Sequence, residues 1–136
     1  MNYSLEENLK GLNEASNQIF QNNKAKGFWD NERNVGELLM LVTSELGEAM
    51  EAHRKNRFAQ LKRLEFELGQ NATMTKEQHW NEKFGFHVKD TFEDEIADAV
   101  IRLMDLSAGL GIDLEKHISA KVKFNTSRPK LHGKAY

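Results

Sequence analysis

The chain is predicted to be an all-α protein, and three observations support this. Leu, Glu, Lys, Ala and Asn dominate while Val is scarce, a composition that favours helices over strands. The single proline, Pro129, lies near the C-terminus, so nothing upstream forbids long helices. Apolar residues recur at helical spacing in several segments. At 136 residues, we expect one domain over residues 1–136 with a sizeable core.

The predicted fold is a bundle of four to five helices. The first helix begins with a capping box formed by Ser4 and Glu7 and ends before Gly27, which suits a left-handed stop. The second helix starts near Asp30 or Asn34 and continues to about residue 57. Its apolar surface is interrupted by carboxylates, which packing alone does not explain.

Residues 54–90 are predicted to form a helical or loop insert. Short helices are expected before Gly69 and around Trp80, separated by a polar loop over residues 70–75, and Gly85 weakens the second of them. Two further helices follow this insert, one capped by Thr91 and one capped by Asp113, and a basic tail occupies residues 127–136.

Composition excludes several classes of protein. The formal net charge is −2, so there is no global signature of nucleic-acid binding. The chain has no cysteine, which rules out disulfides and thiolate chemistry and fits a reducing cytosol. The N-terminus lacks the apolar core of a signal peptide, and no apolar run reaches the roughly 20 residues of a membrane span. A cytoplasmic protein without a membrane or nucleic-acid partner is expected.

Two pairs of carboxylates give the strongest indication of chemistry. Glu45 and Glu48 are three residues apart on one predicted helix, and Glu95 and Asp98 are three apart on another. Side chains at this spacing share a helix face. If the two helices face each other, the four like charges require a hard divalent cation such as Mg²⁺. Pairs at this spacing are also common on solvated faces, but these two lie among Leu, Val, Ile and Ala.

Cationic and aromatic residues complete the predicted site. Lys121, Asn125 and Arg128 lie on one face of the last helix, where they suit phosphate groups and a base or sugar edge. Trp29 has two interpretations, as a core residue and as a base-stacking contact with substrate. Arg102 either neutralises Asp98 one turn away or belongs to the site.

The acidic segments SELGEAMEA (44–52) and EDEIADAVIRLMDL (93–106) resemble the MazG-like all-α nucleoside triphosphate pyrophosphohydrolases. The ending KVKFNTSRPKLHGKAY (121–136) is also similar to that family. Two departures are evident: Ser44 stands where the family's first motif often has a glutamate, and the insert at residues 54–90 is longer than usual.

The resemblance implies hydrolysis of nucleoside triphosphates to the monophosphate and pyrophosphate, with Mg²⁺ or, as a substitute, Mn²⁺. We expect Glu48 and Glu45 to be the catalytic carboxylates, and the resemblance assigns the metal ligands to Glu45, Glu48, Glu95 and Asp98. It assigns substrate contacts to positions on the last helix, and it implies a homodimer or homotetramer acting in nucleotide-pool sanitation or dNTP control. Alternatives are a dUTPase, a phosphoribosyl-ATP pyrophosphatase and a non-catalytic helical interaction module.

Overall fold

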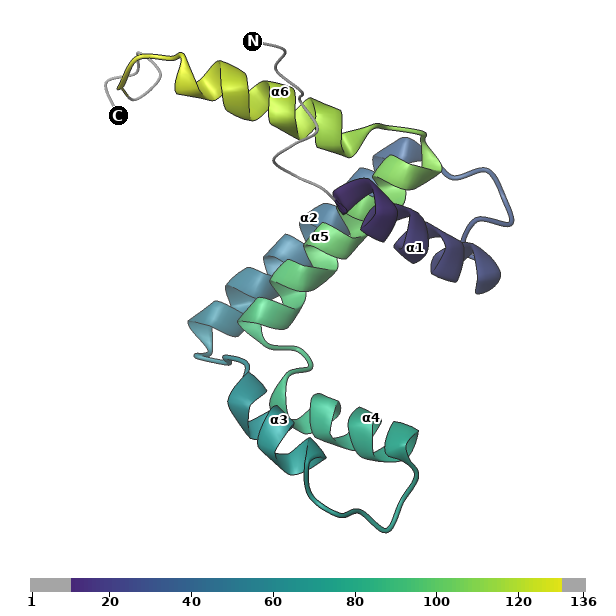
Figure 1. Ribbon diagram of the computed structural model, residues 1–136, viewed down its shortest axis with the longest axis vertical. Helices are drawn as coiled ribbons and strands as arrows, with labels where there is room; N and C mark the ends of the chain where they lie inside the picture. Colours follow the sequence, from purple (N-terminus) through teal and green to yellow (C-terminus); the bar gives the residue numbers. More distant parts are fainter. Residues whose placement is uncertain (1–10, 131–136) are drawn as a thin grey trace. The chain divides into compact units, whose positions relative to one another are not determined.

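The computed structural model describes residues 11–130, and all regular elements in that range are helices. The helices are α1 (Leu12–Ala25), α2 (Val35–Arg54), α3 (Leu61–Leu68), α4 (Lys76–His87), α5 (Phe92–Gly109) and α6 (Leu114–Thr126) (Figure 1). The all-α prediction is therefore confirmed. The described range has six helices rather than four or five, because the insert contributes two of them.

The described residues form two compact units. One unit is a continuous segment, residues 34–102, and the other combines residues 11–33 with residues 103–130. Helix α5 belongs to both, since its first part lies in the continuous unit and its last turns lie in the other. Each unit is described separately below.

The buried face of helix α2 includes one carboxylate, Glu45. The helix begins after Asn34, whose side chain accepts a hydrogen bond from the backbone N–H of Glu37 (3.2 Å), so Asn34 rather than Asp30 is the cap. Its buried residues recur three or four apart and are Leu38, Val42, Glu45, Ala49 and Ala52. This spacing defines a single helix face. Glu45 therefore lies in the apolar stripe, as the sequence indicated.

The insert begins and ends at residues with left-handed backbone. Asn56 has φ 54° just after α2, and Asp90 has φ 59° just before α5. Asn and Asp tolerate this conformation better than most residues. Between them, α3 and α4 form a helical hairpin, and α4 is capped by Thr75, which accepts a hydrogen bond from the backbone N–H of Gln78 (3.2 Å). The insert is thus helical on both sides of its loop.

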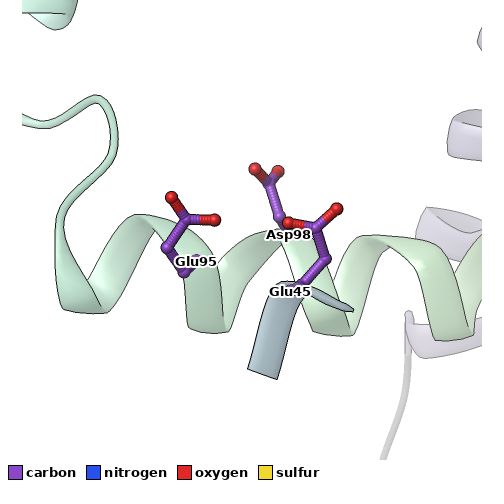
Figure 2. A group of neighbouring side chains, drawn as sticks. All are labelled: Glu45, Glu95 and Asp98. Carbon is purple, nitrogen blue, oxygen red and sulfur yellow. The ribbon is translucent and has the colours of Figure 1, made fainter. Parts of the chain in front are cut away.

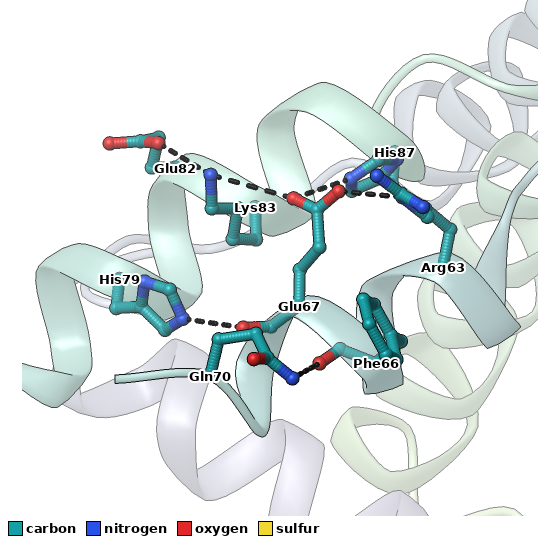
Figure 3. A network of polar contacts seen from close by, with 8 residues as sticks. All are labelled: Arg63, Phe66, Glu67, Gln70, His79, Glu82, Lys83 and His87. Atoms are coloured by element: carbon teal, nitrogen blue, oxygen red, sulfur yellow. Dashed lines mark hydrogen bonds and ion pairs between the residues drawn. The ribbon is translucent and has the colours of Figure 1, made fainter. Parts of the chain in front are cut away.

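A network of polar contacts joins the two helices of the hairpin. The carboxylate of Glu67 on α3 accepts a hydrogen bond from Arg63 Nε (2.7 Å), and it lies 3.2 Å from Nε2 of the buried His87 and 3.5 Å from Lys83 Nζ, both on α4 (Figure 3). His87 and then Arg63 lower the pKa of Glu67 to about 2. Arg63 lies on the same helix as Glu67, so the two partners on α4, His87 and Lys83, are the ones that fix α3 against α4.

The second unit joins α1 to the start of α6. The side-chain Nδ2 of Asn13 donates a hydrogen bond to Asp113 Oδ1 (2.9 Å), and the side-chain Oδ1 of Asn13 accepts one from the backbone N–H of Glu115 (3.2 Å). Asp113 also accepts from the backbone N–H of Lys116 (3.1 Å), which confirms it as the predicted cap of α6. The ends of both helices therefore share one set of polar contacts.

The first predicted helix is shorter in the structure. Gly11 has φ 96°, a value that ends a right-handed helix, and α1 begins at Leu12. The prediction of one unbroken helix through residue 11 was therefore wrong, while its left-handed stop at Gly27 (φ 85°) is confirmed. The capping box of Ser4 and Glu7 lies outside the described residues, as does the tail beyond residue 130. Across residues 11–130, no helix has the length and apolar character needed to cross a membrane.

Candidate metal centre

Three of the four predicted carboxylates lie together in the continuous unit. Glu45 projects from α2, and Glu95 and Asp98 project from adjacent turns of α5 toward the same point (Figure 2). Each offers one oxygen, and these oxygens all lie within 4.8 Å of one another. Ligands on opposite sides of a Mg²⁺ ion are about 4.2 Å apart, twice the Mg–O distance. The group therefore needs only a small contraction to share one such ion.

Burial and the charges of neighbouring carboxylates raise the pKa of Glu95 and of Asp98. Glu95 is only 5% exposed, and its burial, followed by the charges of Glu48 and Glu45, raises its pKa to about 7. Burial, followed by the charge of Asp94, also raises the pKa of Asp98. Negative charge on this group is therefore energetically unfavourable at neutral pH, and a bound cation would offset that unfavourable energy.

Arg102 makes the one ion pair that joins this group to a cation within residues 34–102. Its Nε donates to Glu45 Oε1 at 2.5 Å, and its charge lowers the pKa of Asp98. The predicted alternatives for Arg102 were a pair with Asp98 and a role in the site. Its direct contact is with Glu45, so one cation faces three carboxylates.

Glu48, the fourth predicted ligand, lies outside the group of three. It is exposed, and Ser44 Oγ donates to its Oε1 at 3.4 Å. Its charge nevertheless contributes, after burial, to the raised pKa values of Glu95 and Asp98. Glu48 therefore lies beside Ser44 and outside the three carboxylates whose oxygens lie within 4.8 Å of one another.

The predicted substrate contact Trp29 is engaged within the second unit. Its Nε1 donates to Asp105 Oδ1 (3.0 Å), and its ring meets Phe20 edge-on at 5.2 Å between centroids. A Cβ added at Gly109 would lie 2.3 Å from Trp29 Cη2, so the ring packs against the backbone of α5. These contacts favour the packing interpretation over base stacking.

Lys121, Asn125 and Arg128 also belong to the second unit. Lys121 Nζ lies 5.0 Å from the centroid of the Phe124 ring, and the guanidinium carbon of Arg128 lies 5.7 Å from it. Both cations therefore lie near one half-exposed ring, Lys121 from within α6 and Arg128 from just beyond its end. Their shared face was predicted from the spacing, whereas the ring near both of them was not.

Asp94 was not singled out from the sequence as a site residue. It precedes Asp98 by one helical turn, and its charge contributes to the raised pKa of that residue. The spacing of four was the available signal, but an acidic first turn is also common in helices for reasons of the helix dipole alone.

These features define an all-α protein with a group of three carboxylates, two of them buried, and one arginine. Comparison with family models, with curated proteins and with solved structures gave no match. The resemblance to MazG-like pyrophosphohydrolases therefore stays a prediction, carried by the sequence motifs.

Proposed function

We propose that the protein is a Mg²⁺-dependent nucleoside triphosphate pyrophosphohydrolase of the MazG-like all-α type. The observation that carries this proposal is the group formed by Glu45, Glu95 and Asp98, with oxygens within 4.8 Å. Three carboxylates and the single Arg102 have a formal charge of −2, which one divalent cation neutralises. Both motifs of the resemblance contribute to this group, so the motif match and the geometry agree.

The donor set fits Mg²⁺. All candidate ligands are carboxylate oxygens, the hard donors that Mg²⁺ prefers, and Mn²⁺ is an alternative with similar preferences. Glu48, which is exposed one helical turn after Glu45, is the proposed further ligand. When bound, the ion supplies charge neutralisation for phosphate oxygens and lowers the pKa of a coordinated water.

The residues of the chain have separate roles in the proposed reaction. A water oxygen attacks the α-phosphorus, the bond from that phosphorus to the bridging oxygen breaks, and pyrophosphate leaves. Glu48, which is exposed and accessible to water, orients the water and accepts its proton, with Glu45 held in place by Arg102. The resemblance assigns phosphate contacts to Lys121 and Arg128 and a nucleoside contact to Asn125.

An oligomer is part of the proposal. Large apolar residues remain exposed on α2 and on the first part of α5, and they include Leu39, Met40, Leu46, Met50, Ile96 and Val100. Patches of this kind mark interaction surfaces. We expect a homodimer or homotetramer in which these helix faces pack against a second copy.

Product analysis tests the proposal. The protein is incubated with Mg²⁺ and each canonical and damaged nucleoside triphosphate, including dUTP, and with phosphoribosyl-ATP. We expect monophosphate and pyrophosphate in equal amounts from the preferred substrate, which also separates the dUTPase and phosphoribosyl-ATP alternatives. Glu48→Gln and Asp98→Asn should abolish turnover in folded protein. Full turnover in both variants would refute the site assignment.

A second candidate function, a non-catalytic helical interaction module, is favoured by the ion pair between Arg102 and Glu45. An arginine that satisfies a buried carboxylate makes part of the group a structural contact. This candidate predicts no Mg²⁺ binding and no stabilisation by nucleotides. A thermal shift produced by Mg²⁺ with a nucleotide would exclude it.

A further inference from the structure

A hollow adjoins the carboxylate group in the continuous unit. It has a volume of about 720 Å³, and its walls come from α4 and from the first part of α5. Phe84 and Gly85 contribute to the first wall, and Ala97, Asp98 and Ile101 to the second. Asp98 thus belongs both to the hollow and to the candidate metal centre. A ligand in this hollow would therefore lie next to Asp98, one of the three carboxylates of the candidate metal centre.

Gly85 leaves the α4 side of the hollow open. It lies inside α4, where glycine is a poor choice because it weakens helices. A Cβ built at Gly85 meets nothing within 4 Å among atoms outside its own helix segment, so packing within this chain does not require glycine. A glycine with no internal partner leaves room for a group that comes from outside the chain.

The walls have the chemistry of a site for a planar base. Phe84 is half-buried and its ring stacks on Trp80, with centroids 5.6 Å apart and an interplanar angle of 28°. This contact holds Phe84 in place beside the apolar Val88 and Ile101. Asn81 also lines the hollow and offers both a donor and an acceptor for the edge of a base. The remaining lining combines apolar side chains with five charged residues, which are Lys89, Asp90, Glu93, Asp94 and Asp98.

We infer that the hollow between α4 and the first part of α5 binds the nucleobase of the substrate. The insert at residues 54–90 then has a role, since it supplies α4 and therefore the wall formed by Phe84 and Gly85. This inference rests on the proposed function, because it places the base beside the carboxylates that serve the phosphates. It assigns nucleoside recognition to the hairpin rather than to Trp29.

Two substitutions test the inference from opposite walls. Gly85→Leu and Ala97→Leu each place a side chain in the hollow without removing any contact. For a nucleotide that the wild-type protein hydrolyses, we expect KM to rise about 10-fold or more, with kcat changed far less. Inorganic tripolyphosphate, which has no base, is the second probe, and its inhibition constant should stay at the wild-type value in both variants.

Glu77→Leu is the matched control, because it adds a leucine at an exposed position of α4 that does not line the hollow. Its KM should remain close to the wild-type value. Unchanged KM in both leucine variants would overturn the inference while leaving the proposed function intact. A changed oligomeric state with weakened tripolyphosphate inhibition would also overturn it, since a second copy would then occupy the hollow. Failure of the wild-type protein to hydrolyse any nucleotide would overturn the proposed function and the inference together.

Discussion

Replacement of Glu95 by glutamine should stabilise the metal-free protein at alkaline pH. The pKa of this buried carboxylate is raised from 4.5 to about 7, so the folded state binds its proton more tightly than the unfolded state does. The free energy of unfolding therefore falls as pH rises from 4.5 to about 7, and stays low above that pH. The neutral amide of Glu95→Gln does not incur this loss.

The size of the effect follows from the shift. At about 1.4 kcal/mol for each pKa unit, the full loss is about 3 kcal/mol, which corresponds to a Tm difference of about 10 °C for a chain of this size. The raised pKa of Asp98 acts in the same direction in both proteins, so the difference between them isolates Glu95. Mg²⁺ should reverse the order, because only the wild-type protein has the full ligand set.

Urea unfolding in the presence of a chelator measures this difference. The two proteins should be nearly equal in stability at pH 4.5, and Glu95→Gln should be the more stable by about 3 kcal/mol at about pH 8. Glu65→Gln, at an exposed carboxylate of α3, is the control and should show no such divergence. Parallel pH profiles for wild type and Glu95→Gln would refute the electrostatic account of the group.

Four other predictions address the rest of the molecule. Gly109→Ala should destabilise the protein by about 1–3 kcal/mol in thermal unfolding, because its Cβ would overlap the Trp29 ring; an unchanged Tm would contradict that packing. The wild-type protein should lose stability as pH falls from 4.5 to about 2, because the carboxylate of Glu67 is then protonated. Glu67→Gln should remove this dependence of stability on pH, which unfolding at graded low pH measures. Met40→Lys, at a 64% exposed apolar position of α2, should shift the oligomer toward monomer in light scattering. Gly85→Ala should raise stability by about 0.5–1 kcal/mol in urea unfolding, since the added methyl meets open space.

Local signals predicted most of the helices. The caps at Asn34 and Asp113 and the stop at Gly27 each depend on a few neighbouring residues, and each is confirmed. The break at Gly11 was missed because the apolar period continues across it, and the pattern alone does not give the backbone angle of a glycine.

The candidate site was predictable only where it depends on one helix. The spacing of Glu95 and Asp98 fixes their common face, and the sequence sufficed for that. The partner of Arg102 is 57 residues away, so sequence spacing suggested Asp98 and the structure gives Glu45. The rotation of α2 against α5 decides that Glu45 joins the group while Glu48 stays at its edge. The hollow beside Asp98 likewise depends on where α4 packs.

The most direct test of the central claim is calorimetric titration of Mg²⁺ into the metal-free protein at about pH 8. We predict saturable binding at the carboxylate group that weakens as pH falls below about 7, because protons then compete for Glu95. Glu95→Gln and Asp98→Asn should each weaken this binding strongly, whereas Glu65→Gln should leave it unchanged. Absence of saturable binding in the wild-type protein, or equal binding in all variants, would contradict a Mg²⁺ site at Glu45, Glu95 and Asp98.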